Sequence, residues 1–272
     1  MKRKLILCFL AGGKIDNQPK CFIKTPNNKT ILEEEFEIFN RITYDEYNIE
    51  LENIIILYPK NYEKLEFTKL FEKNGISIDF LEGGETLQET INNVILFIQN
   101  KEVEDNTFIC FISTDTPLIN HEAIDDIIKR FSLLDGDVFY PFVSKEVYRV
   151  KFGDKMAKNR TFIKLSKDSF CGTGIVIIKK GILLNIWEKI KKILENRKNP
   201  YQIAKLLNLD PITILKIMTG RYTVLELEDK INSMFKIKTQ GMLTNFANLA
   251  FNIDNQQDIK DYQEILKEKS KL

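Results

Sequence analysis

The feature that most restricts the fold is an unbroken apolar run near the N-terminus, from Leu5 to Leu10. A strand with apolar residues at every position is covered on both faces, as in the centre of a parallel sheet. A second run, Thr107 to Ile112, is rich in β-branched and aromatic residues and is typical of another buried strand. The two runs predict an α/β protein built around a central sheet.

Apolar spacing predicts that strands and helices alternate through the first half of the chain. The expected strands are 5–10, 53–57, 76–81 and 107–112, and the expected helices are 30–42, 62–73, 87–99 and 122–134. Thr30 and Glu33 have the spacing of a capping box at the start of the first helix. This alternation predicts a three-layer, Rossmann-like fold, in which a mostly parallel sheet carries helices on both faces.

The second half is expected to add strands at 137–143, 175–179, 235–240 and 250–253, with helices at 182–196 and 259–267. Asn199-Pro200 begins a helical stretch with helices at 201–207, 211–219 and 224–234, and Asp210-Pro211 and Thr223 are capping signals within it. We expect one α/β domain over residues 1–272 with a helical insert at about 199–234. The insert is expected to form a lid or the surface of a homodimer.

Composition excludes several classes of function. The net charge is +1, which gives no electrostatic basis for binding nucleic acid or an anionic membrane. The four cysteines form no C-x-x-C pair and the chain has one histidine, so neither a structural zinc site nor a histidine relay is expected. The apolar run Leu5 to Ala11 is short for a signal sequence. We therefore expect a reduced, cytoplasmic protein without a membrane span.

Chemistry-bearing residues follow three of the predicted strands. Gly12-Gly13 follows the first, Gly83-Gly84 the third, and Asp115 the fourth, where Pro117 ends the ladder. Ligands of open α/β sheets bind at the carboxyl ends of the strands, and glycine turns there let backbone N–H groups meet phosphate oxygens. We expect Asp115 to hold a divalent metal on a nucleotide phosphate. The alternative is that Asp115 only ends the strand and caps a turn.

The segment Ser144 to Leu165 carries many basic residues and few acidic ones. It is either a solvated surface or a loop that clamps a phosphorylated acceptor, since Arg and Lys are the side chains that bind phosphate. The sequence leaves both interpretations open.

Short motifs in a fixed order run through nearly the whole chain. They are Leu10-Ala11-Gly12-Gly13 with Lys20, Gly83-Gly84-Glu85-Thr86, Asp115-Thr116-Pro117-Leu118, Gly172-Thr173-Gly174, and the closing run Asn252 to Ile259. This ordered set resembles the MobA-like nucleotidyltransferase family, also called the NTP-transferase domain, which has a glycosyltransferase-A-like α/β fold. The resemblance implies transfer of an NMP group from an NTP to a phosphorylated small-molecule acceptor, with Mg²⁺ (or Mn²⁺) and release of pyrophosphate.

The resemblance also implies residue roles. Asp115 and Asp254 would hold the metal, and Lys20 would stabilise charge on the α-phosphate. Gly84 would let the base lie against the backbone, and Arg160 would hold the acceptor. The other substrate-binding positions implied are Leu10, Ala11, Gly12, Gly13, Lys14, Gly83, Thr86, Lys164 and Gly172.

Two alternatives stay open. The first loop, Lys14 to Pro19, is short and lacks the second glycine and the arginine of the family pattern, so a non-catalytic nucleotide-binding module with a degenerate site is the rival function. Asp254 precedes a predicted helix, so it is alternatively an ordinary N-cap. A glycosyltransferase that uses a nucleotide-sugar donor is disfavoured, because that class usually carries an Asp-x-Asp motif. Asp115-Thr116-Pro117 lacks the second acid of this motif.

Overall fold

The computed structural model describes residues 2–16, 18–60, 62, 71, 76–166, 168–196, 202 and 205–269. The expected helix at 62–73 falls almost wholly outside these residues, and the one at 201–207 falls partly outside them. All element bounds below refer to the described part of the chain.

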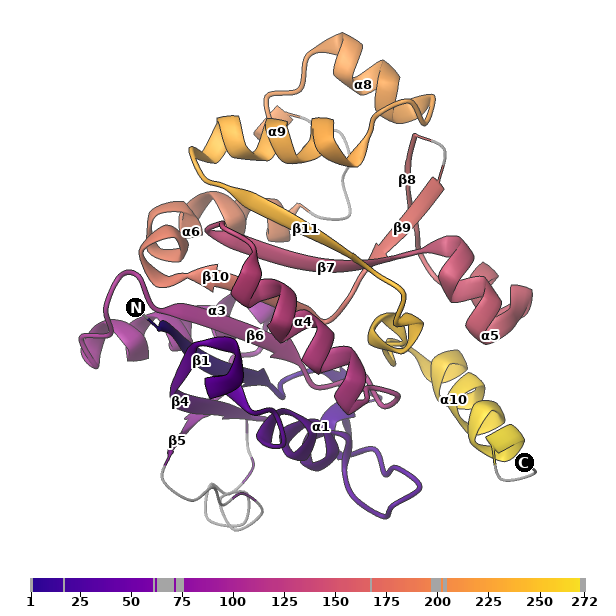
Figure 1. The fold of residues 1–272 in the computed structure, drawn as a ribbon. Coiled ribbons are helices and arrows are strands. Elements are labelled where there is room, and N and C mark those ends of the chain that lie inside the picture. The colour runs from indigo at the N-terminus through magenta and orange to yellow at the C-terminus, as the bar shows by residue number, and fades with distance from the viewer. Residues whose placement is uncertain are drawn as a thin grey trace.

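A mixed sheet of nine strands forms the centre of the molecule (Figure 1). Its first half is parallel, in the order β5-β4-β1-β6. These strands are β1 (Arg3–Leu10), β4 (Ile49–Tyr58), β5 (Ser77–Glu82) and β6 (Phe108–Ser113). The two continuous apolar runs are therefore neighbours at the centre of the sheet, as their patterns predict.

The other half of the sheet mixes directions. β10 (Ile175–Lys179) lies antiparallel between β6 and β7 (Val138–Ser144), and β11 (Thr239–Thr244) runs parallel beside β7. The outer strands β9 (Asp168–Gly172) and β8 (Ile163–Leu165) continue antiparallel from β7. A short separate hairpin joins β2 (Lys14–Ile15) to β3 (Gln18–Pro19).

Helices cover both faces of the sheet because successive residues of β1 point to opposite sides. Leu5, Leu7 and Phe9 belong to the core beneath α1 (Ile31–Asn40) and α4 (His121–Leu133). Ile6 and Cys8 belong to the core beneath α3 (Leu87–Asn100) and α6 (Lys180–Glu195). The predicted three-layer, Rossmann-like fold is confirmed.

A third cluster of buried residues lies beyond the sheet edge. It joins α5 (Lys145–Asn159), α10 (Gln256–Lys269) and the 3-10 helix η3 (Ala247–Ala250). The helices α8 (Pro211–Met218) and α9 (Val224–Phe235) begin at their expected caps, Asp210 and Thr223, and lie beyond β11 (Figure 1). All four cysteines are buried free thiols. Within the described residues, every helix is too short or too polar to cross a bilayer.

Two local predictions are wrong, and one that was left open is decided. The segment after Ser144 forms helix α5 rather than a loop, because Ser144 caps it and Tyr148, Met156 and Ala157 are buried. The basic side chains of this helix face outward, as the solvated-surface interpretation expects. Residues 250–253 form no strand, since Ala250 ends η3 and its neighbours fill the third cluster. The strand expected at 235–240 begins only at Thr239, because α9 extends through Phe235 and Lys236 turns left-handed.

The start of α1 gives a stability test. The Thr30 side chain accepts a hydrogen bond from the Glu33 N–H at 3.2 Å, and the Glu33 carboxylate accepts one from the Thr30 N–H at 2.6 Å. Thr30→Ala should lower the free energy of unfolding by about 1 kcal/mol, because it removes the hydroxyl that accepts from the Glu33 N–H, while the bond from the Thr30 backbone N–H to the Glu33 carboxylate can remain.

Urea denaturation measures this change. The matched control is Thr43→Ala, because Thr43 precedes a 3-10 helix, is exposed and makes no capping bond. We expect the control to stay within about 0.5 kcal/mol of wild type. Equal losses in the two variants would contradict the capping role.

Candidate active site

The two glycine turns meet at the carboxyl edge of the sheet. Gly83 donates its N–H to the Tyr58 carbonyl at 2.8 Å, and a Cβ built on Gly83 would lie 3.9 Å from the Gly12 Cα. The turns after β1 and β5 therefore come into contact, as predicted from their positions in the sequence. Two glycines facing each other leave the backbone open to a ligand.

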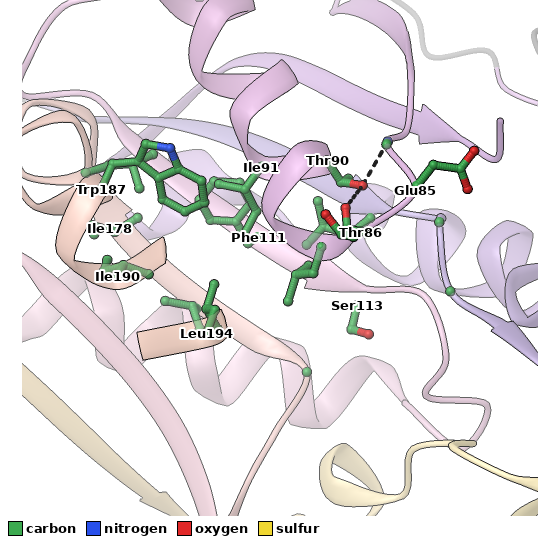
Figure 2. A pocket seen from close by; sticks show the side chains of 18 of the residues that line it. Glu85, Thr86, Thr90, Ile91, Phe111, Ser113, Ile178, Trp187, Ile190 and Leu194 are labelled. Atoms are coloured by element: carbon green, nitrogen blue, oxygen red, sulfur yellow. Dashed lines mark hydrogen bonds between the residues drawn. The ribbon is translucent and has the colours of Figure 1, made fainter. Parts of the chain in front are cut away.

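The second turn is held by the first residues of α3. Gly84 donates its N–H to the Thr90 hydroxyl at 3.0 Å, and that hydroxyl donates to the Thr86 carbonyl at 2.9 Å (Figure 2). Thr86 is the N-cap of α3 and accepts from the Glu89 N–H. A Cβ on Gly84 would lie 2.2 Å from the Glu89 Cβ, so only glycine fits this turn.

The hairpin of β2 and β3 returns Lys20 to the first glycine turn. The Lys20 N–H donates to the Gly13 carbonyl at 2.9 Å, and the Lys20 stem lies against Gly13, where a built Cβ would be 3.3 Å from its Cδ. Asp16 at the hairpin tip accepts from the Gln256 side chain at 2.6 Å. The short first loop is thus an ordered structure that delivers Lys20 to the site.

Lys20 lies between the two predicted metal ligands. Its ammonium is 3.2 Å from the Asp115 carboxylate and 3.0 Å from the Asp254 carboxylate. Burial by itself lowers the pKa of Lys20, but the two carboxylates outweigh it and the pKa is raised above its ordinary value. Asp115 and Asp254, which are far apart in the sequence, therefore share one cation.

Asp115 is fixed by Ser113 at the end of β6 and by Asn252 in the closing motif. Its Oδ1 accepts from the Ser113 hydroxyl at 2.6 Å and from the Asn252 amide at 3.1 Å. The Ile253 N–H donates to the Asp115 carbonyl at 2.9 Å, which joins the closing motif to the loop after β6. The side chain points into the cluster and is 13% exposed, so it does more than end a strand.

Asp254 is not the cap of α10. The Asn255 side chain accepts from the N–H groups of Gln257 and Asp258, which is the N-cap role. Asp254 instead projects its carboxylate, 58% exposed, toward Lys20 and Arg160. The N-cap interpretation of Asp254 is wrong, because the next residue takes that role.

Of the two residues expected at the acceptor, Arg160 lies in the cluster and Lys164 lies elsewhere. Arg160 is 3.3 Å from the Asp254 carboxylate and donates to the Asn252 side chain at 2.9 Å. Lys164 on β8 packs against the insert, where a Cβ built on Gly220 would be 2.6 Å from the Lys164 Cε. Gly172 lies under the Tyr140 ring, whose hydroxyl a Cβ would overlap.

Several residues that complete the site have no motif of their own. Asn252 bridges Asp115 and Arg160, and Thr90 holds the second glycine turn. Glu35 on α1 is fully buried and accepts from the Thr116 N–H at 3.1 Å. The signal for Glu35 is an acidic residue on the apolar face of a helix, in line with Ile31 and Phe39.

The oxygen atoms of the cluster suit a hard cation. Within the described ranges, no group of three or more His, Cys, Asp or Glu side chains is placed to bind one metal ion. Asp115 and Asp254 are the two carboxylates that could hold a cation, and both contact the Lys20 ammonium. Mg²⁺ bound through one or two carboxylates completes its shell with phosphate oxygens and water, so these residues fit Mg²⁺ or Mn²⁺ brought with a nucleotide.

A cavity of about 590 Å³ opens beside this cluster. Its polar end is lined by both glycine turns together with Lys14, Lys60, Glu85, Thr86 and Ser113, and Leu10 lies there as well. Ala11 is fully buried behind the first turn. The volume is in the range of small-molecule sites, and the predicted nucleotide-binding positions border it.

The sequence matches no known family model and no curated protein. Solved structures do share the fold. A hypothetical transferase from Thermus thermophilus aligns with a TM-score of 0.67 and 18% identity over 95% of this chain and 100% of that one. A 2-C-methyl-D-erythritol 4-phosphate cytidylyltransferase from Francisella tularensis gives 0.53 and 13% over 96% and 99%.

A third structure, CMP:2-keto-3-deoxy-manno-octonic acid synthetase complexed with CTP, gives a TM-score of 0.52 and 6% identity over 98% and 100% of the two chains. At these identities the likeness shows the fold alone. The chain shares its fold with these three enzymes, one of which is named a cytidylyltransferase. The finer MobA-like resemblance stays a prediction from the motifs.

Glu35 generates a pH prediction. Burial, and secondly the charge of Asp115, raise the pKa of the Glu35 carboxyl well above its ordinary value. The Glu35 carboxyl therefore favours the folded state at a pH below its pKa in the unfolded chain. This contribution to stability is lost as the pH rises toward the pKa of Glu35 in the folded protein. Glu35→Gln keeps the acceptor for Thr116 and removes the titration, so the variant should gain stability over wild type at pH 8.

Chemical denaturation at pH 4 and pH 8 measures the difference. We expect the advantage of Glu35→Gln to shrink or vanish at pH 4. Glu46→Gln on the exposed 3-10 helix Tyr44–Tyr47 is the surface control, with little change at either pH. An advantage of the same size at both pH values would contradict the burial argument.

Proposed function

We propose that this chain is a nucleotidyltransferase that moves an NMP group from an NTP to a phosphorylated small-molecule acceptor and releases pyrophosphate. The observation that carries the proposal is the Lys20 ammonium held between Asp115 and Asp254 beside the paired glycine turns. The shared fold of named cytidylyltransferases supports it.

The chemistry asks for charge neutralisation more than for proton transfer. An anionic acceptor attacks an anionic α-phosphate, so preorganised positive groups lower the barrier. The backbone N–H groups at Gly12 and Gly13, with Lys14 and Lys20, would hold the triphosphate. The base would lie at Gly83 and Gly84, where no side chain covers the backbone.

Asp115 and Asp254 would hold Mg²⁺ or Mn²⁺. The ion, when bound, neutralises charge on phosphate oxygens and holds them in line. Ser113 and Asn252 keep the Asp115 carboxylate oriented toward Lys20. Lys20 would turn from the two carboxylates to the phosphates when an NTP arrives, and Arg160 at the rim of the cluster would orient the acceptor phosphate.

The rival hypothesis, a nucleotide-binding module without turnover, rested on the short first loop. The hairpin delivers Lys20 into the cluster in spite of its length. Lys14 and Lys60 line the cavity beside the glycine turns. They would supply positive charge where the MobA-like pattern has an arginine. We therefore favour catalysis over simple binding.

A direct assay separates the two hypotheses. Thermal shifts with the four NTPs, with and without Mg²⁺, identify the nucleotide, because a ligand that binds the folded state raises its melting temperature. Pyrophosphate release is then measured with that NTP and a set of phosphorylated acceptors. Binding without pyrophosphate release from any acceptor would favour the regulatory module.

Asp115 generates the main prediction about turnover. Asp115→Asn should lower kcat by roughly 100-fold or more, because the variant would lose a carboxylate ligand of the cation that neutralises phosphate charge. Asp229→Asn on the exposed side of α9 is the matched control and should turn over normally. Circular dichroism checks the fold of both variants. A rate like wild type in a folded Asp115→Asn protein would reject the assignment.

Lys20 generates a prediction about metal binding without nucleotide. Lys20→Met removes the cation that competes for Asp115 and Asp254, so the free variant should bind Mn²⁺ about tenfold more tightly than wild type. Mn²⁺ binding is followed by electron paramagnetic resonance. Lys14→Met, which removes a lysine that lines the neighbouring cavity, is the control and should match wild type. Equal affinity in Lys20→Met and wild type would contradict the competition.

A further inference from the structure

The cavity beside the glycine turns continues inward from its polar end into a part lined by apolar side chains. From its polar end it runs between α3 and α6, over the sheet strands β6 and β10. We name this inner part the apolar slot. It is lined by Ile91 of α3, Phe111 of β6, Val176 and Ile178 of β10, and Leu183, Trp187, Ile190 and Leu194 of α6.

Figure 2 shows the two ends of the cavity. Ile178, Trp187, Ile190 and Leu194 gather at one end, and Glu85, Thr86 and Ser113 lie toward the other. Phe111, Ile178, Leu183 and Trp187 are almost fully buried and form the floor. A ligand that fills the whole cavity therefore has one polar end and one apolar end.

The hydrogen-bonding groups that line the slot determine which kind of ligand it can bind. Among the side chains that line it, only Trp187 carries a polar atom, and its Nε1 is buried without a partner among the described residues. A nucleobase or a sugar placed there would leave nearly all of its donors and acceptors unpaired, which is costly. Hydrocarbon or aromatic surface carries no such cost and gains from leaving water.

The slot opens at the reacting end of the site. Ser113, Thr173 and Gly174 line the same cavity, and the Ser113 hydroxyl lies 2.6 Å from the Asp115 carboxylate. A molecule with its apolar body in the slot would thus present its polar end near Asp115. An acceptor phosphate must reach this place to attack the nucleotide.

We propose that the apolar slot binds the body of the acceptor, and that the acceptor is a phosphate or phosphonate of an apolar alkyl, prenyl or aryl group. The role as acceptor rests on the proposed function, whereas binding in the slot does not. In the reaction, an acceptor phosphate oxygen forms a bond to the α-phosphorus of the NTP as the bond to pyrophosphate breaks. The product carries the nucleoside on one phosphorus and the apolar group on the other phosphorus of a new P–O–P linkage, and pyrophosphate leaves.

The chain contains a natural reporter for this test. Trp187 is its only tryptophan and lies in the slot, so intrinsic fluorescence reports directly on occupancy. The full-length protein is titrated with n-octyl phosphate below its micelle concentration, and separately with ribose 5-phosphate. We expect a saturable change of Trp187 emission with octyl phosphate and none with ribose 5-phosphate.

Filling the slot supplies the variant. Val176→Phe adds bulk inside it without adding a tryptophan, and aromatic residues suit a strand. Asn185→Phe adds a phenyl ring on the exposed side of α6 and is the matched control. We expect octyl phosphate to bind at least about tenfold more weakly to Val176→Phe and equally well to Asn185→Phe. Ile190→Phe repeats the test from the helix side if Val176→Phe fails to fold.

The outcomes separate the two proposals. Octyl phosphate binding that Val176→Phe weakens supports the slot, even if no NTP is turned over, in which case the proposed function alone fails. Pyrophosphate release with octyl phosphate as acceptor supports both. No saturable change of Trp187 emission, equal binding by Val176→Phe and wild type, or an equal response to ribose 5-phosphate would overturn the slot proposal.

Discussion

One interaction organises the site: a single ammonium, on Lys20, held by two carboxylates that are far apart in the sequence. Two acids placed this close repel each other unless a cation lies between them. The free protein solves this problem with its own lysine, and Arg160 adds a second positive group beside Asp254. The loop after β6 and the closing motif before α10 are thus drawn together electrostatically as well as by the backbone bond from Ile253 to Asp115. The two acids and two cations of this cluster balance in charge, so under the proposed function an incoming phosphate and metal would exchange for existing partners.

This cluster can form because several strands of the sheet end at the same edge. β1, β5 and β6 are parallel and stop at one edge, so the turns at Gly12, Gly83 and Asp115 come together without any long loop. The first turn needs only a small hairpin to bring Lys20 back against Gly13. A loop shorter than that of the MobA-like pattern can therefore still place Lys20 at the site, because the hairpin turns the chain directly back toward Gly13.

Sequence reasoning found those parts of the molecule that depend on local pattern. The central strands follow from continuous apolar runs, and the convergence of Gly12, Gly83 and Asp115 follows from parallel topology. Helix α5 was missed because charged residues dominate its pattern and only a few side chains, such as Tyr148 and Met156, are buried. The buried carboxyl of Glu35 and the bridging amide of Asn252 depend on contacts across the fold that no local pattern encodes. Lys164 is basic like Arg160 and close to it in sequence, yet the turn into β8 carries it to the insert.

The apolar slot was beyond sequence reasoning for a related reason. Leu183, Trp187, Ile190 and Leu194 have the spacing of an ordinary core face, and periodicity does not tell whether such a face packs tightly or lines a space. Protein interiors are close-packed, and voids between helices lose dispersion contacts that packing would recover. A gap between α3 and α6 that opens to a polar reaction site is therefore costly for the free protein, and filling it with an apolar ligand recovers the lost contacts. Under the proposed function, the acceptor would be selected by two separate physical properties: charge in the cluster of Lys20 and Arg160 beside the cavity, and apolar shape behind Ser113.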